Sequence, residues 1–119
     1  MAYVDGFLVP VPKRSIGAYR ALARKAGKIW MEYGALEFRE SVADDVSWGK
    51  RTSFPRAVKR KSNETVMFSW IVYKSRKQRD AVNKKVMADK RLAKMMAGKK
   101  MPFDAKRMIW GGFKIIVDF

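Results

Sequence analysis

The sequence predicts an α+β fold in which four strands form one antiparallel sheet and two helices pack on one of its faces. Two observations support this prediction. Apolar residues alternate with polar ones, or run together, in four short segments, and they recur at three- and four-residue steps in two longer segments. With 119 residues and 13.7 kDa, the chain has the length of a single domain whose core needs neither a disulfide nor a structural metal.

The first half of the chain predicts a strand over residues 3–9, a helix over 13–33 and a second strand over 36–44. Pro10 is expected to end the first strand, because proline cannot donate a hydrogen bond to a sheet. Gly34 follows the helix as a suitable C-terminal cap, since glycine adopts positive φ without a Cβ clash. These segments therefore give the order strand, helix, strand.

Residues 45–64 are the least regular part of the chain. Long loops without any local order are uncommon in compact domains. We therefore expect a short helix after Ser53 and a turn at Ser62-Asn63. A third strand, over residues 65–73, follows this excursion.

The last third of the chain predicts a helix and a fourth strand. Ser75 and Gln78 have the spacing of a capping box, and the helix that they begin is expected to break near Asp89 and to end by Gly98. The fourth strand spans residues 108–117, with Gly111-Gly112 as a bulge or a place of close backbone approach. The complete order, strand, helix, strand, strand, helix, strand, is typical of the ferredoxin-like arrangement.

Both faces of the predicted sheet are apolar in its last two strands. Residues 66–73 have no polar face, and the fourth strand places apolar side chains on both sides. Two helices can cover one face only, and soluble monomers rarely expose a large apolar surface. We therefore expect a homodimer in which the two sheets pack against each other.

Several ordered motifs resemble a known family over nearly the whole chain. They are Tyr3-Val4-Asp5-Gly6-Phe7, Gly34-Ala35-Leu36, Asp44-Asp45-Val46, Phe68-Ser69-Trp70, Arg79-Asp80, Met101-Pro102-Phe103-Asp104, Lys106-Arg107-Met108 and Gly111-Gly112-Phe113. In these motifs the sequence resembles the YbaA-like family of uncharacterised bacterial proteins. The resemblance implies a single dimeric α/β barrel domain over residues 1–119. It implies no activity, because the wider superfamily includes oxygenases, haem-degrading enzymes, isomerases and proteins without known chemistry.

The composition excludes several classes of chemistry. The chain has no cysteine and no histidine, which rules out thiolate or imidazole catalysis, Cys/His zinc sites and histidine-ligated haem. We expect no cofactor. No apolar run approaches the roughly 18 residues of a membrane span, and the first residues lack the basic start of a signal peptide. A cytoplasmic location is therefore expected.

The candidate ligand-binding residues include polar groups that interrupt the apolar strands. Asp5 lies on the same side of the first strand as Tyr3 and is either a base or anchor inside the barrel, or a structural carboxylate bonded to backbone or arginine. The hydroxyls of Tyr3 and Ser69 could hydrogen-bond a ligand. Trp48 lies in the irregular excursion and could close over an opening.

Charged residues near the strand ends form a second candidate group. Asp44 and Asp45 end the second strand, whereas Asp104, Lys106 and Arg107 precede the fourth. If these ends converge, the cluster could orient an anionic ligand, with Arg107 in bidentate contact. Three carboxylates could also hold Mg²⁺, although their spacing matches no known metal loop. Salt bridges and turn caps are the alternative interpretation.

The chain is strongly basic. Lys and Arg number 27 against 11 Asp and Glu, a formal net charge of +16, and most of this charge lies in residues 56–107. Such a surface could bind nucleic acid through phosphate contacts, or could simply be solvated. We predict a homodimer that binds a small anionic organic molecule inside the barrel. Nonspecific nucleic-acid binding and a structural dimer without ligand remain the alternatives, and the sequence does not show whether the protein is an enzyme.

Overall fold

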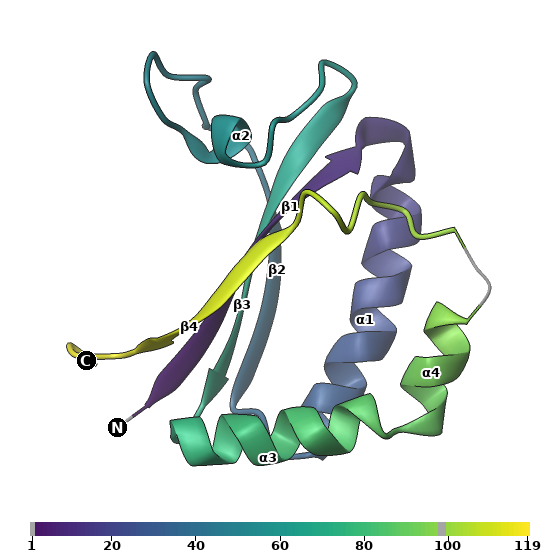
Figure 1. Cartoon of the computed structure of the whole chain (residues 1–119), viewed down its shortest axis with the longest axis vertical. Coiled ribbons are helices and arrows are strands. Elements are labelled where there is room, and N and C mark those ends of the chain that lie inside the picture. Colours follow the sequence, from purple (N-terminus) through teal and green to yellow (C-terminus); the bar gives the residue numbers. More distant parts are fainter. Residues whose placement is uncertain (1, 98–99) are drawn as a thin grey trace.

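Helices cover one face of a four-stranded antiparallel sheet in the computed structural model, which describes residues 2–97 and 100–119 (Figure 1). The elements are β1 (Tyr3–Pro12), the 3-10 turn η1 (Lys13–Ser15), α1 (Ile16–Glu32), β2 (Glu37–Val42), α2 (Phe54–Ala57), β3 (Glu64–Tyr73), α3 (Arg76–Met87), α4 (Lys90–Met96) and β4 (Ile109–Lys114). The strands lie in the order β2-β3-β1-β4. This arrangement confirms the predicted α+β fold.

The strand register decides which side chains meet on each face of the sheet. Phe7 of β1 lies opposite Ser69 of β3 and Trp110 of β4, and Ser69 lies opposite Glu40 of β2. Residues directly opposite one another in an antiparallel sheet share a face. These four side chains, with Asp5 two residues from Phe7, therefore line the face that the helices cover.

Two strand boundaries differ from the prediction because the neighbouring strand sets them. β1 continues through Pro10 to Pro12, since β4 pairs with β1 only as far as Leu8 and the missing proline N–H groups then cost little. β4 ends at Lys114, opposite Tyr3, rather than at residue 117, because β1 begins there. β2 is also shorter than predicted at both ends.

The helix signals in the sequence are confirmed. The Ser53 hydroxyl accepts a hydrogen bond from the Arg56 N–H at 3.1 Å and begins α2. The Ser75 hydroxyl caps α3 in the same way. The predicted break divides α3 from α4, and the Asp89 carboxylate accepts from the Arg91 N–H at 2.8 Å. The predicted end at Gly98 lies outside the described residues.

α1 packs closely against β2. The helix ends before Gly34, whose φ of +113° is the left-handed conformation expected of the cap. A Cβ atom at Gly27 would lie 2.8 Å from the ring of Phe38, so glycine permits this approach of helix and strand. No helix of the described residues is long and apolar enough to cross a membrane.

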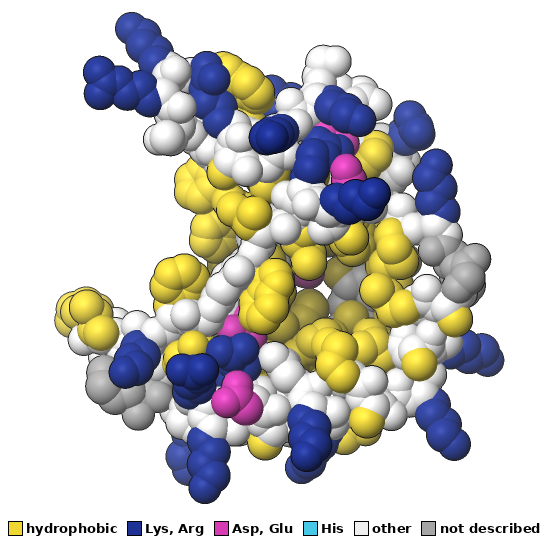
Figure 2. Space-filling model, in the orientation of Figure 1, with side chains coloured by type: hydrophobic (Ala, Val, Ile, Leu, Met, Phe, Trp, Pro, Cys, Tyr) yellow, Lys and Arg dark blue, Asp and Glu magenta, His cyan; other side chains and the backbone are white. Residues whose placement is uncertain are grey.

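The opposite face of the sheet lacks a helical layer, although α2 lies beside one end of it (Figure 1). It is apolar over β1, β3 and β4 and polar along β2, which contributes Glu37, Arg39 and Ser41. We call it the open face. Its side chains include Val4, Leu8, Phe68, Trp70, Ile109 and Phe113. Phe113 is 63% exposed. Figure 2 shows hydrophobic side chains gathered along this face. The apolar side chains predicted on both sides of the last two strands are therefore present on the open face in β3 and β4.

Candidate ligand-binding site

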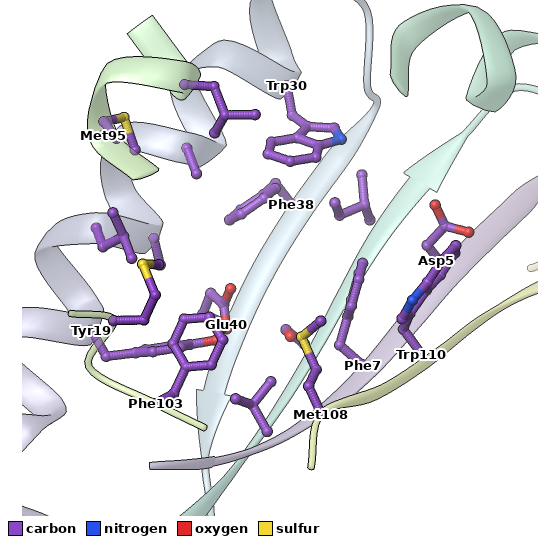
Figure 3. Close-up of a pocket in the computed structure, with 18 of the residues that line it drawn as sticks. Asp5, Phe7, Tyr19, Trp30, Phe38, Glu40, Met95, Phe103, Met108 and Trp110 are labelled. Carbon is purple, nitrogen blue, oxygen red and sulfur yellow. Dashed lines mark hydrogen bonds between the residues drawn. The ribbon is translucent and has the colours of Figure 1, made fainter. Parts of the chain in front are cut away.

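A cavity of about 450 Å³ lies between the helix-covered face of the sheet and helices α1, α3 and α4 (Figures 2 and 3). Its volume falls in the range of small-molecule sites. The apolar side chains that line it are Phe7, Val9, Leu22, Ala23, Ala26, Trp30, Phe38, Ile71, Met87, Leu92, Met95, Met96, Met101, Phe103, Met108 and Trp110.

The walls of this cavity differ in character. The sheet and α1 supply aromatic rings, among them Phe38 and Trp30, whose centroids lie 6.0 Å apart. The remaining wall, from α3 through α4 to the start of β4, supplies five of the eight methionines of the chain. Methionine side chains are flexible and fill irregular spaces. One side of the cavity is therefore suited to stacking, and the other to adapting its shape.

Glu40 brings a carboxyl group to the cavity from the middle of β2 (Figure 3). The Tyr19 hydroxyl of α1 donates to its Oε1 at 2.8 Å. Burial raises the pKa of the Glu40 carboxyl, although the hydroxyls of Tyr19 and Ser69 partly oppose that shift. Among the described residues, Glu40 forms no ion pair. It is thus an acid held in apolar surroundings without a cation.

Asp5 also lines the cavity but has a cationic neighbour. It is 1% exposed, and its Oδ1 lies 3.8 Å from Nε of Arg79. Burial raises the pKa of Asp5, and Arg79 is the main group that opposes the rise, followed by Asn83 and Tyr73. Of the two predicted interpretations, this contact favours the structural carboxylate paired with arginine.

A polar cluster beside Asp5 holds the adjacent aromatic residues in place. Oδ1 of Asn83 accepts hydrogen bonds from Trp30 Nε1 and from the Tyr73 hydroxyl, each at 3.1 Å. Nη2 of Arg79 donates to the Tyr3 hydroxyl at 3.1 Å, and the guanidinium lies over the Tyr3 ring. Tyr3 therefore supports Arg79 and is not among the residues that line the cavity.

The charged cluster predicted at the ends of the second and fourth strands forms around Arg107, but with a different set of acidic residues. Arg107 binds Glu64 through two hydrogen bonds of 2.8 and 2.6 Å and binds Asp104 at 2.8 Å. Asp44 and Asp45 take no part in these ion pairs. Arg107 also donates to the backbone carbonyl of Lys59. The predicted convergence of both aspartates with Arg107 is therefore wrong, because Glu64 at the start of β3 occupies the guanidinium.

This ion cluster lies apart from the residues that line the cavity. Neither Asp104 nor Arg107 lines it, and the pKa values of Glu64 and Asp104 are lowered by their hydrogen bonds to Arg107. Among the described residues, no three acidic side chains come together as they would to hold a metal ion. The basis for predicting an anionic ligand beside Arg107 is thus removed.

Two further predicted residues have contrasting positions. Ser69 lines the cavity opposite Glu40. Trp48 lies in the excursion before α2, with the guanidinium groups of Arg56 and Arg60 at 4.8 and 5.4 Å from its ring centroid. Trp48 does not line the cavity. Its cation–π contacts are the kind that order an exposed segment.

Glu40 is the acidic residue of the cavity lining that the sequence analysis missed. The signal was present, because Phe38, Glu40 and Val42 alternate on one face of β2 and an acid therefore interrupts an otherwise apolar face. The methionines of α4 and of residues 101–108 carried no comparable signal. Their meeting with α1 depends on the path of the chain between α4 and β4.

Basic side chains are spread over the outside of the molecule and are not concentrated at the cavity (Figure 2). Several are already engaged: Arg79, Arg91 and Arg107 form ion pairs. The nucleic-acid alternative stays a prediction.

The family of the chain follows from comparison with known sequences. Residues 2–105 match the family described as Protein of unknown function (DUF1428). The chain belongs to this family. Curated DUF1428 relatives include Uncharacterized protein YbaA of Escherichia coli strain K12 and of Shigella flexneri, each 52% identical over 118 residues that cover 99% of both chains. The resemblance inferred from the motifs is thereby confirmed.

Solved structures resemble this DUF1428 protein in fold. A mutant of SnoaB, a cofactor-independent oxygenase from Streptomyces nogalater, has a TM-score of 0.62 at 10% identity and covers 98% of this chain and 95% of its own. A nipsnap family protein of unknown function from Agrobacterium tumefaciens has a TM-score of 0.61 at 12% identity, with coverage of 96% and 87%. A dimeric ferredoxin-like protein from an uncultured marine organism has a TM-score of 0.56 at 10% identity and covers both chains fully. At such identities the likeness shows the fold alone.

Proposed function

We propose that this DUF1428 protein is a homodimer that binds a small, largely apolar organic molecule in the cavity between its sheet and helices. The observation that carries the proposal is the cavity itself, which has a volume of about 450 Å³ and walls of aromatic and methionine side chains. Burying apolar ligand surface against such walls provides the main favourable free energy of binding.

The charges around the cavity favour an uncharged ligand over the anion predicted from the sequence. Two carboxyl groups, Asp5 and Glu40, line the cavity and would repel an anion. Arg39 is a cation among the lining residues, but it is exposed and lies 3.7 Å from the carboxylate of Glu37. Among the described residues, an anion inside the cavity would thus find no buried cation in the lining to offset the loss of its hydration.

The open face supports the homodimer. Strands β1, β3 and β4 present apolar side chains on it, and the apolar C-terminal residues Ile116, Val117 and Phe119 are also exposed. A second copy brings a matching apolar sheet, so a two-fold interface would cover both open faces at once. The marine ferredoxin-like protein of similar fold is described as dimeric. A pair of such sheets would form the dimeric α/β barrel.

Filling the cavity tests the binding proposal. Ala23 of α1 lines the cavity, whereas Ala21 on the same helix is exposed, so Ala23→Phe and Ala21→Phe form a matched pair. The probe is Nile red, an uncharged dye whose fluorescence rises in apolar surroundings. We expect Ala23→Phe to weaken Nile red binding about tenfold or more, because the phenyl ring overpacks the site. Ala21→Phe is expected to bind as the wild type does.

The controls separate loss of the cavity from loss of the fold. Circular dichroism and sedimentation velocity should show both alanine variants folded and in the same oligomeric state as the wild type. Equal Nile red binding by all three proteins would place the dye elsewhere and contradict the proposal. Failure of the wild type to bind would contradict it as well.

A further inference from the structure

We infer that the cavity selects an aromatic ligand carrying a hydroxyl group, and that the Glu40 carboxylate accepts the hydrogen bond of that hydroxyl. This inference rests on the proposed ligand cavity and names the chemistry that it recognises. It follows from the acceptor capacity of Glu40, from the absence of a cation paired with it among the described residues and from the rings around it.

The Glu40 carboxylate has acceptor positions that its neighbours cannot fill. A carboxylate offers about four lone-pair sites. Tyr19 donates one hydrogen bond at 2.8 Å, and the hydroxyl of Ser69, directly across on β3, has one further hydrogen to give. The remaining acceptor positions of Glu40 lie in the cavity, because its side chain extends there from β2 (Figure 3). A ligand in the cavity can reach them.

Among the residues that the structure describes, no cation pairs with Glu40. Arg79 is paired with Asp5, since its Nε lies 3.8 Å from the Asp5 carboxylate. The Arg39 side chain donates a hydrogen bond to the backbone carbonyl of Phe38. It also forms an ion pair with Glu37 on the other side of β2. Burying a carboxylate that no cation balances is costly, and a ligand hydroxyl reduces that cost by adding a donor to the one that Tyr19 supplies.

A neutral hydroxyl fits the site better than an ammonium group. An ammonium carries three donors, and the apolar walls would leave most of them without acceptors. A hydroxyl carries a single donor, which Glu40 satisfies. Its bond to a charged acceptor is of the stronger kind.

Aromatic rings on both sides of Glu40 favour a ring system as the carrier of the hydroxyl. Phe103 meets Tyr19 edge to face with centroids 5.7 Å apart, and Trp110 stacks on Phe7 at 6.3 Å. Figure 3 shows these rings arranged around the open centre of the site. A flat aromatic body can stack against such rings, which adds to the free energy of apolar burial.

The test compares two probes of similar size that differ in one donor. 2-Naphthol has the hydroxyl, and 2-methoxynaphthalene has a methyl ether in its place. Both are measured by displacement of Nile red at neutral pH. We expect the wild type to bind 2-naphthol about tenfold more tightly, the discrimination that a hydrogen bond to a charged acceptor provides.

Two variants of β2 identify the acceptor. Glu40→Met removes the carboxylate at similar length and is expected to bring the affinity ratio of the two probes close to one. Glu37→Gln changes the acid on the opposite side of β2, outside the cavity, and is expected to keep the wild-type ratio.

The outcomes distinguish this inference from the proposed function. Equal binding of both probes by the wild type, or an unchanged preference in Glu40→Met, would overturn the donor-selective site while leaving the cavity as a ligand site. A wild-type ratio close to one overturns the inference even if Glu40→Met does not fold. If neither probe displaces Nile red, the cavity proposal itself fails.

Discussion

Two glutamates show how the fold gives the same side chain opposite chemistry. Glu64 lies 4% exposed at the start of β3, and its hydrogen bonds to Arg107 lower the pKa of its carboxyl. Glu40 lies on the neighbouring strand β2, where burial without a cation raises the pKa. The first is an internal ion pair that ties the start of β3 to the chain before β4. The second is the acceptor that we propose for a ligand hydroxyl.

These opposite shifts predict opposite effects of pH on stability. Because its folded pKa is raised, Glu40 takes up a proton on folding at pH values above its ordinary pKa of 4.5. The free energy of unfolding of the wild type therefore falls as pH rises through that window. Glu40→Gln removes this dependence. We expect urea denaturation to show the variant gaining stability relative to the wild type from acid to neutral pH.

Glu64→Gln is the matched comparison. The folded pKa of Glu64 is lowered, so its contribution is present above pH 4.5 and is lost as the pH falls through the folded value. We expect the variant to lose about 2 kcal/mol of unfolding free energy at neutral pH, and less in acid. A parallel drift of both variants with pH would show that the two carboxyl environments do not differ as described.

At the scale of elements, the sequence patterns predicted the order of helices and strands because each pattern depends on near neighbours. Caps such as Ser75, the break at Asp89 and the positive φ of Gly34 belong to this class, and all are confirmed. Strand ends are set by partners distant in sequence. β1 can extend through Pro12 because its pairing with β4 does not continue beyond Leu8. The residues around Pro12 carry no information about that pairing.

The candidate site was predicted only in part for the same reason. Asp5 and Ser69 were identified because each interrupts an apolar strand, and both line the cavity. Arg107 and Asp104 were expected to meet a ligand, but their partner Glu64 lies 43 residues from Arg107 in sequence and occupies the guanidinium. The methionine wall likewise depends on how α4 and residues 101–108 return across α1.

At the scale of the whole molecule, the sheet separates two apolar surfaces with different roles. The helix-covered face forms the cavity, and the open face is available to a second copy. β1 and β3 are central to both, because alternate residues of these strands point to opposite sides. The proposed dimer interface and the proposed ligand cavity therefore share the same two strands.

A charge on the open face tests the proposed homodimer. Phe113→Glu places a carboxylate on β4, at a side chain that is 63% exposed in the protomer. We expect sedimentation equilibrium to show a dimeric wild type and a folded variant whose dimer dissociates at least tenfold more readily, because burying an unpaired charge is costly. Met31→Glu, on the exposed side of α1, should remain dimeric. A monomeric wild type at micromolar concentration would contradict the dimer.

The most direct measurement is a crystal structure of the protein grown with 2-naphthol. The account predicts one molecule per protomer between the sheet and α1, with its ring among Phe7, Trp30 and Phe38 and its oxygen within hydrogen-bonding distance of Glu40. Electron density for 2-naphthol on the open face would contradict the assignment of this cavity as the ligand site. A cavity without density for 2-naphthol, in crystals grown at a saturating concentration of the probe, would contradict it as well.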